Sequence, residues 1–147
     1  MDVRGVIAQS TLVKGLSDQE IDQIAAIAEV KKYEGGQALV RQFEKTRHMM
    51  IVLDGAARIN TYSGNSIAHL GPGSVIGEIA ILDDEPRSAT VISDRGTTVA
   101  VISAQKLREV MDSNPHIELV LLRNLSKGLC AHIRMTNLKL EELFGRM

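Results

Sequence analysis

Cysteine is almost absent from this sequence, since Cys130 is the only one. A single cysteine excludes an intrachain disulfide, and such a chain fits a reducing compartment. The first ten residues lack the roughly 7–15-residue apolar segment of a secretory signal peptide. No apolar run reaches the ~18 residues of a membrane span. We therefore expect a cytoplasmic protein that does not insert into a membrane.

The sequence also lacks an excess of basic residues. Its 17 Lys and Arg stand against 18 Asp and Glu, for a net charge of -1. DNA-binding domains usually gather positive charge on one face, so direct DNA binding is not expected. With 147 residues, of which 44% are hydrophobic and 24% charged, the composition is that of a soluble globular protein. We expect one domain over residues 1–147.

Signatures of catalysis are scarce as well. The histidines, at positions 48, 69, 116 and 132, are scattered rather than paired at metal-ligand spacing. The sequence has neither a Gly-x-Ser-x-Gly nucleophile motif nor a Walker-type phosphate loop. Cys130 lies in an apolar helical segment, where an inert thiol is expected. The sequence therefore predicts no catalytic residue, no metal site and no cofactor.

Secondary structure is expected in three blocks. Residues 17–30 show the spacing of an amphipathic helix. Residues 31–103 contain short β-prone runs separated by turn residues, which predicts an antiparallel β-roll or jelly roll. Residues 104–112 and 116–141 return to helical spacing. The fold class is thus mainly β within α+β, with one helix before the roll and two after it.

Local signals support these boundaries. Ser17 followed by Glu20 is the pattern of a capping box at the start of the first helix. Among the turn signals in the roll are Asp54-Gly55 and the run from Asp94 to Gly96, which predict separate strands on either side.

Residues 77–90, GEIAILDDEPRSAT, combine groups suited to a sugar phosphate. Gly77 lets the backbone approach a ligand, and the residues after it favour about one helical turn, whose free N–H groups attract anions. Pro86 turns the chain and leads to Arg87, whose planar fork suits phosphate oxygens. Glu78 is an acceptor suited to a sugar hydroxyl. On spacing alone, an ion pair between Glu78 and Arg87, or two exposed charges, explains the pattern equally well.

The run GSVIGEIAIL, followed by PRSATV, resembles the phosphate-binding cassette of the cyclic nucleotide-binding domain superfamily, and the likeness extends over roughly residues 12–140. The resemblance implies the β-roll fold of that family and a cyclic mononucleotide ligand. It implies that Arg87 binds the cyclic phosphate, that Glu78 binds the ribose 2′-hydroxyl, and that the Gly77 backbone lies close by. Main-chain N–H groups would complete the phosphate site at Ile79, Ala80, Ser88 and Ala89.

Two positions bear on the nucleotide base. At the place of Ser88, family members that respond to cAMP have serine or alanine, while cGMP-dependent kinases have threonine. The resemblance therefore favours cAMP and leaves cGMP open. By alignment, His132 falls where the family contacts the base, with Arg134 as a second candidate. A histidine that only faces solvent is the alternative.

The resemblance predicts a regulatory module that signals by moving its last helix. Apolar residues left over on that helix would pair two chains or dock an effector protein; they are Leu138, Leu140, Leu143 and Phe144. No helix-turn-helix segment follows this helix within the 147 residues, so we expect a standalone module. Two alternatives remain: a degenerate β-roll that binds no nucleotide and acts as an interaction subunit, or a regulatory fragment of a larger cAMP-controlled enzyme or channel.

Overall fold

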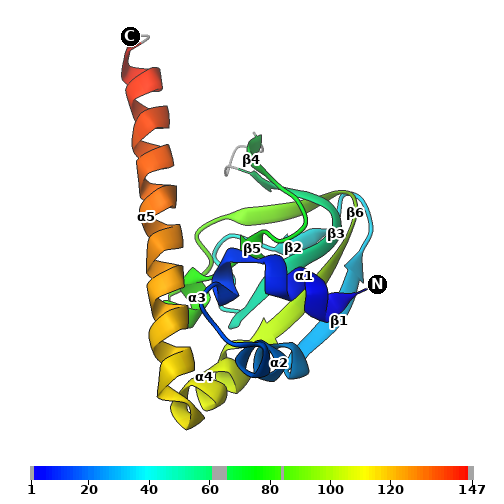
Figure 1. Ribbon diagram of the computed structural model, residues 1–147. Coiled ribbons are helices and arrows are strands. Elements are labelled where there is room, and N and C mark those ends of the chain that lie inside the picture. The colour runs from blue at the N-terminus through cyan, green and yellow to red at the C-terminus, as the bar shows by residue number, and fades with distance from the viewer. Residues whose placement is uncertain (1, 61–65, 84, 146–147) are drawn as a thin grey trace.

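The computed structural model describes residues 2–60, 66–83 and 85–145, and it shows a β-roll flanked by helices (Figure 1). The strands form one antiparallel sheet in the order β1-β6-β3-β4, with β2 added along β6 and β5 along β3. This confirms the predicted fold class. The strands are β1 (Ala28–Tyr33), β2 (Ala38–Val40), β3 (His48–Asn60), β4 (Ser66–Leu70), β5 (Val75–Ile76) and β6 (Thr90–Ser103).

Helices precede, interrupt and follow the roll. Two short ones near the N-terminus, α1 and the 3-10 helix η1, were not predicted, because elements of seven and three residues are too short to show a helical period. The helices are α1 (Val3–Gln9), η1 (Thr11–Val13), α2 (Asp18–Ala26), α3 (Ile79–Leu82), α4 (Ala104–Ser113) and α5 (Pro115–Gly145).

The helix predicted over residues 17–30 is shorter than expected. Its capping box is present: the Ser17 hydroxyl accepts from the Glu20 N–H at 3.2 Å, and the Glu20 carboxylate accepts from the Ser17 N–H at 2.9 Å. The helix ends at Ala26, however, and the chain enters β1 at Ala28. Strand β1 pairs with β6 along its whole length. This long-range pairing overrides the local helical spacing of the last residues.

Two predicted strand breaks are bends within continuous strands. Strand β3 runs through Asp54-Gly55, and β6 runs through Gly96; Gly55 pairs with Thr97, and the register shifts on both sides of the bend. Gly55 has a φ of +82°, and a β-carbon there would lie 2.0 Å from the Gly96 carbonyl oxygen. These glycines therefore mark a bulge where two strands approach closely, rather than the end of a strand.

The C-terminal helices are each longer than the predicted 104–112 and 116–141. Asn114 separates them, and its side-chain oxygen accepts from the His116 N–H at 3.1 Å. Pro115 takes the first position of α5, where a missing N–H does no harm. Helix α5 runs along one side of the roll and projects beyond it at its C-terminal end (Figure 1).

Buried hydrophobic residues form two clusters, one on each face of the sheet. Alternate residues of β3 supply them, because side chains along a strand point to opposite faces. Met49 and Ile51 join the outer cluster, which packs against the helices, while Met50 and Val52 join the inner cluster inside the roll. The inner cluster lies beneath the site described below.

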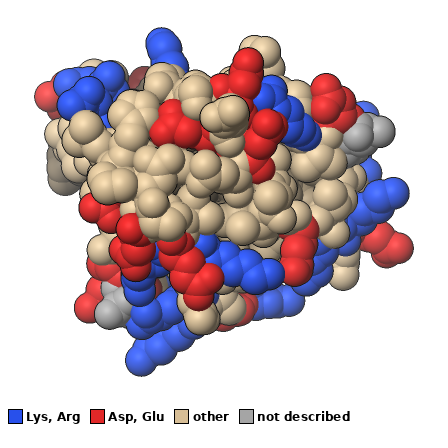
Figure 2. Space-filling view, turned by 60° about the horizontal axis from the view of Figure 1, so that its bottom comes forward, with Lys and Arg blue, Asp and Glu red and all other residues tan. Residues whose placement is uncertain are grey.

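On the side of the fold where α2 and α4 lie, acidic and basic side chains are interspersed around an uncharged middle (Figure 2). Within the residues that the structure describes, no helix combines the length and the apolar character needed to cross a membrane.

Candidate functional site

A cavity of about 420 Å³ opens between the β-roll and α5. Its volume lies within the ~300–1,000 Å³ typical of small-molecule sites. His132 and Thr136 of α5 form one wall, and the segment between β5 and β6 forms the other. The floor is apolar and includes Val40, Ile59, Leu70, Ile76 and Val91.

The cavity brings together most of the predicted ligand-binding residues. Ile79 and Ala80 begin the one-turn helix α3, as the sequence predicted for their main chain, while their contact with a ligand stays a prediction. The predicted residues that line the cavity are Gly77, Glu78, Arg87, Ser88, Ala89 and His132.

Arg87 is the only charged side chain that is buried among the described residues, with 6% of its surface exposed. Three of the five N–H donors of a guanidinium are engaged. Nε donates to the Thr46 hydroxyl at 2.9 Å, one Nη donates to the Gly77 carbonyl at 3.3 Å, and the other donates to the His48 carbonyl. The remaining donors are available to a ligand.

The charge of Arg87 has no counter-ion in the described part of the chain, because no carboxylate forms an ion pair with it. The ion pair with Glu78 that the spacing allowed is therefore not formed. Burial lowers the pKa of the Arg87 guanidinium, and the nearby charge of Glu44 acts in the opposite direction. A buried charge without a partner is unfavourable, so this arrangement favours the entry of an anion.

Gly77 is needed for the position of Arg87. Its φ is +77°, and a β-carbon there would lie 2.2 Å from Nη1 of Arg87 and 3.3 Å from the His48 carbonyl oxygen. Glycine thus lets the guanidinium reach across the start of the segment to β3.

The loop between β2 and β3 also holds the main chain of Arg87. The Phe43 N–H donates to the Arg87 carbonyl at 2.8 Å, and the Arg87 N–H donates to the Glu44 carbonyl at 2.8 Å. Sequence reasoning gave this loop and Thr46 no role in the site, because their contacts with Arg87 join residues about forty positions apart and no local pattern signals them.

His48 adds no positive charge to the site at neutral pH. Burial, and then the charges of Arg87 and Lys31, lower the pKa of its imidazole, while Glu44 opposes them. Because the ordinary pKa of histidine is already near 6.5, a lowered value keeps the ring neutral at pH 7. Arg87 is then the principal positive charge at this wall of the cavity.

Helix α5 is fastened on both sides of the cavity. Asn124 donates two hydrogen bonds to main-chain carbonyls around η1, at 2.7 and 2.9 Å. Further along the helix, the Lys139 ammonium group donates to the carbonyl of Ile67 in β4. His132 and Thr136 lie between these attachments and line the cavity. The helix therefore covers the cavity as a lid.

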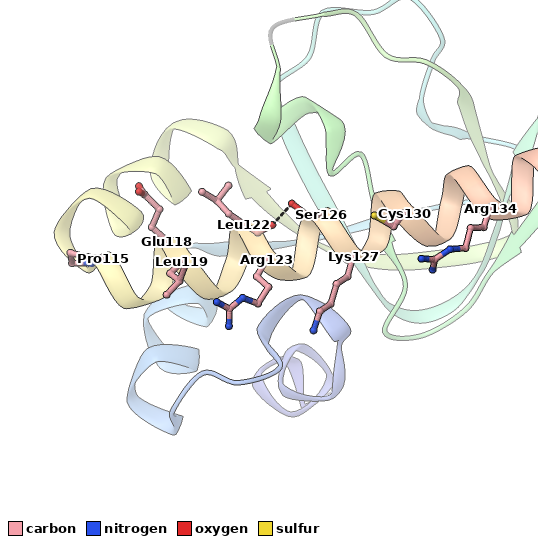
Figure 3. A pocket seen from close by; sticks show the side chains of 9 residues that line it. All are labelled: Pro115, Glu118, Leu119, Leu122, Arg123, Ser126, Lys127, Cys130 and Arg134. Carbon is pink, nitrogen blue, oxygen red and sulfur yellow. Dashed lines mark hydrogen bonds between the residues drawn. The ribbon is translucent and has the colours of Figure 1, made fainter.

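The outer face of α5 carries a second, shallow hollow of about 840 Å³ (Figure 3). Arg134 as a base contact stays a prediction, but its side chain lines this hollow and not the cavity where His132 lies. The reason is helical geometry: two positions along a helix turn a side chain by about 200°, which sends His132 and Arg134 to different faces.

Known proteins resemble this chain in sequence and in fold. The family model of the cyclic nucleotide-binding domain matches residues 30–114. Glutaminase 1 of Bradyrhizobium diazoefficiens is 25% identical over 137 residues, which are 93% of this chain and 22% of that protein. The cAMP-dependent protein kinase regulatory subunit of Eremothecium gossypii is 26% identical over 117 residues, 80% of this chain and 25% of that protein.

Among solved structures, the catabolite activator protein of Thermus thermophilus has a TM-score of 0.77 and 25% identity, and the match covers 91% of this chain and 63% of that one. The chain thus spans about a quarter or less of the length of the glutaminase and the kinase subunit.

Proposed function

The chain belongs to the cyclic nucleotide-binding domain family, and from this we propose that it is a regulatory module that binds cAMP, in preference to cGMP, in the cavity under α5. One observation carries the proposal: Arg87 is buried at the cavity wall without a carboxylate partner. A cyclic nucleotide supplies the missing anion together with an apolar base. The module is proposed to work in the cytoplasm, without a catalytic role and without a cofactor.

The cavity suggests how each part of the nucleotide is held. The free donors of Arg87 bind the cyclic phosphate, together with main-chain N–H groups of α3 and of Ser88 and Ala89. Glu78, which lines the same wall, accepts from the ribose 2′-hydroxyl. His132 lies over the base from α5. The apolar floor receives the base and sugar faces.

The lid supports a preference for adenine. The Thr136 hydroxyl donates to the carbonyl of His132 at 2.9 Å, so its own hydrogen is used within the helix. The remaining lone pairs only accept hydrogen bonds. Adenine presents an amino group at the position where guanine has a carbonyl oxygen, so an accepting group on the lid suits adenine better. Ser88 at the cavity wall agrees with this choice.

Signalling requires that the nucleotide bind one position of α5 more tightly than another. Arg87 lies at one wall of the cavity and His132 lies on the lid, so a bound nucleotide joins the two. The attachment between Lys139 and Ile67 is a contact that such a movement would make or break. The nucleotide thus sets the position of the C-terminal half of α5.

The outer face of α5 is proposed to pair with α5 of a second copy of the chain. Apolar side chains recur along it at intervals of three, four or seven residues, which are the intervals of a coiled-coil heptad. Most are exposed, including Leu119 at 54% and Ile133 at 57%. This outer apolar stripe consists of Leu119, Leu122, Leu129, Ile133 and Leu140.

The charges beside the stripe favour a parallel pair. Glu118 and Arg123 flank it (Figure 3), five residues apart. In a parallel coiled coil this spacing places each residue beside its opposite in the partner helix. A second copy is therefore preferred over an unrelated effector protein as the occupant of this face.

A larger enzyme under nucleotide control is the second candidate context. The observation that favours it is coverage: the segment that matches this chain makes up 22% of glutaminase 1. The same module, with the same site, would then regulate a catalytic domain.

Calorimetric titration of the purified chain with cAMP and with cGMP tests the proposal. The wild type should bind cAMP more tightly than cGMP. Arg87→Ala should bind cAMP about a hundredfold more weakly, which corresponds to roughly 3 kcal/mol, because a buried phosphate loses its charge partner. Arg87→Lys keeps the positive charge but loses the planar fork of the guanidinium. Its affinity for cAMP should lie between those of the wild type and Arg87→Ala. Arg95→Ala, which removes an exposed arginine of β6, should bind as the wild type does.

Each possible failure has a distinct meaning. Absence of binding by the wild type to either nucleotide at millimolar concentration overturns the function and favours the degenerate β-roll. Unchanged affinity in Arg87→Ala, with the fold checked by circular dichroism, overturns the site. Tighter binding of cGMP overturns only the assignment of the base.

A further inference from the structure

The turn between β2 and β3 holds a side chain that its backbone disfavours. Phe43 has a φ of +75°, and it is the only non-glycine residue with a positive φ in the described parts of the chain. The Glu44 N–H donates to the Arg41 carbonyl at 3.2 Å, so Phe43 is the third residue of a tight turn. Glycine is the usual residue at this place when φ is positive, and a bulky L side chain there is strained.

Burial does not offset this strain. Phe43 is 67% exposed, more than any other large hydrophobic side chain among the described residues. An exposed phenyl group adds little to the stability of the isolated chain. A strained and solvated aromatic side chain therefore points to a contact outside the chain.

The turn presents this phenyl group on a fixed backbone. The Phe43 N–H donates to the Arg87 carbonyl at 2.8 Å, and the Arg87 N–H donates to the Glu44 carbonyl at 2.8 Å. The Gln42 N–H donates to the Thr90 hydroxyl at 2.9 Å. These bonds tie the turn to the roll, so binding a partner would cost little ordering of the loop.

Positive charges accompany Phe43 on the exposed side of the turn. Exposure alternates along the segment, with Arg41, Phe43 and Lys45 turned outward and the residues between them half-buried against the roll. We call Arg41, Phe43 and Lys45 the docking row. The side chain of Arg41 is 71% exposed, although it lies 3.7 Å from the Glu44 carboxylate. Aromatic and arginine side chains are enriched at the energetic centres of protein interfaces.

We propose that the docking row receives an acidic segment of a partner protein, with Phe43 in an apolar pocket of the partner and Arg41 and Lys45 against its carboxylates. A rigid turn suits a pocket of defined shape, which a protein offers and a fluid bilayer does not. Stable attachment to a membrane also needs stronger signals than one phenyl group and a few cations. The net charge of -1 argues against nucleic acid. The proposal does not depend on nucleotide binding.

Peptide display on the immobilised full chain tests the proposal. Random peptides selected on the wild type should be rich in Asp and Glu and contain a large apolar residue. Selected peptides, synthesised and titrated, should bind Phe43→Gly at least about tenfold more weakly. Charge reversal in the double variant Arg41→Glu with Lys45→Glu should weaken peptide binding by a similar factor. Added salt should lower the affinity of the peptides for the wild type. Val30→Ser, which removes a 51% exposed apolar side chain from β1, should leave it unchanged.

Several outcomes would contradict the proposed role of the docking row. They are a selection that yields no acidic peptide, peptides that bind Phe43→Gly as well as the wild type, and Phe43-dependent binding to vesicles rich in phosphatidylserine or to single-stranded nucleic acid in place of peptide. The selected peptides should bind the wild type equally well with and without cAMP, because the docking row and the cavity are separate surfaces. The docking row and the nucleotide site therefore fail or succeed separately.

Discussion

The Thr46 hydroxyl accepts a hydrogen bond of 2.9 Å from Nε of Arg87, across 41 positions of sequence. Two main-chain carbonyls accept from the other end of the same guanidinium. Neutral acceptors orient the side chain without cancelling its charge. This is how the fold keeps a buried arginine in place and leaves it attractive to an anion.

Removing the Thr46 hydroxyl should harm both stability and binding. Thr46→Val keeps the shape but leaves Nε of a buried guanidinium without an acceptor, which should lower the free energy of unfolding by about 2 kcal/mol. It should also weaken cAMP binding, because Arg87 loses its orientation. Urea denaturation and calorimetry measure the two effects. Thr46→Ser retains the hydroxyl and should show neither; a Thr46→Val protein with unchanged affinity would rule out the positioning role.

A β-carbon at Gly77 should displace Arg87. In Gly77→Ala the new carbon would lie 2.2 Å from Nη1, in addition to the strain of an alanine at a φ of +77°. Gly73→Ala is the matched control, because Gly73 has a φ of +88° with no atom within 4 Å of the added carbon. Both variants should lose roughly 1–2 kcal/mol of stability through backbone strain. Only Gly77→Ala should also lose cAMP affinity, by about tenfold or more; equal affinities would contradict the clash.

The helices on either side of the roll could largely be predicted from the sequence, because their signals are local. The capping box of Ser17 and Glu20 and the start of α4 follow from neighbouring residues. The continuity of β3 and β6 could not be predicted. Gly55 and Gly96 lie in short sequences that are typical of turns. Only the close approach of the two strands at these glycines shows that they form a bulge.

The candidate site also contains some residues that the sequence reveals and others that only the structure reveals. Gly77, Glu78 and Arg87 lie within one short segment, so their pattern was visible in the sequence. Thr46 and the neutral state of His48 depend on contacts between distant segments and on burial. A sequence records neither of these directly. The residues proposed to touch the ligand were thus easier to find in the sequence than those that hold them in position.

The link between α2 and α5 should make stability depend on pH. Glu20 accepts from the Ser17 N–H and contacts the His116 ring at 2.7 Å, and these two partners, in that order, lower the pKa of its carboxyl. A carboxyl with a lowered folded-state pKa stabilises the fold above its unfolded pKa, and this stabilisation is lost as the pH falls through the folded pKa. Glu20→Gln should therefore be less stable than the wild type at neutral pH.

Urea midpoints measured between about pH 3 and pH 7 would show this effect. The difference between the wild type and Glu20→Gln should shrink as the pH falls through the acidic range. Glu109→Gln, at an exposed position of α4, should show no such convergence. Parallel pH profiles for the wild type and Glu20→Gln would contradict the role of this carboxylate.

The proposed parallel pairing of α5 predicts a charge-swap result. Sedimentation should show a dimer for the wild type and a monomer for Ile133→Lys, whose exposed position makes the substitution harmless to the single chain. Glu118→Arg should weaken the dimer about tenfold or more, because it places like charges together twice in a symmetric pair. Adding Arg123→Glu should restore it. A dimer that survives Ile133→Lys would place the interface elsewhere.

Glycine at position 43 should stabilise the chain. Phe43→Gly relieves a backbone strain of about 1–2 kcal/mol, and the greater freedom of glycine in the unfolded chain offsets part of this gain. The net increase in the free energy of unfolding should be about 1 kcal/mol, measured as a higher urea midpoint. Phe43→Ala removes the same ring but keeps the disfavoured φ, so it should give no increase. If both variants stabilise the chain equally, the cause is the ring and not the backbone. A gain confined to glycine would show that the phenyl group is kept at the expense of stability, as a docking residue requires.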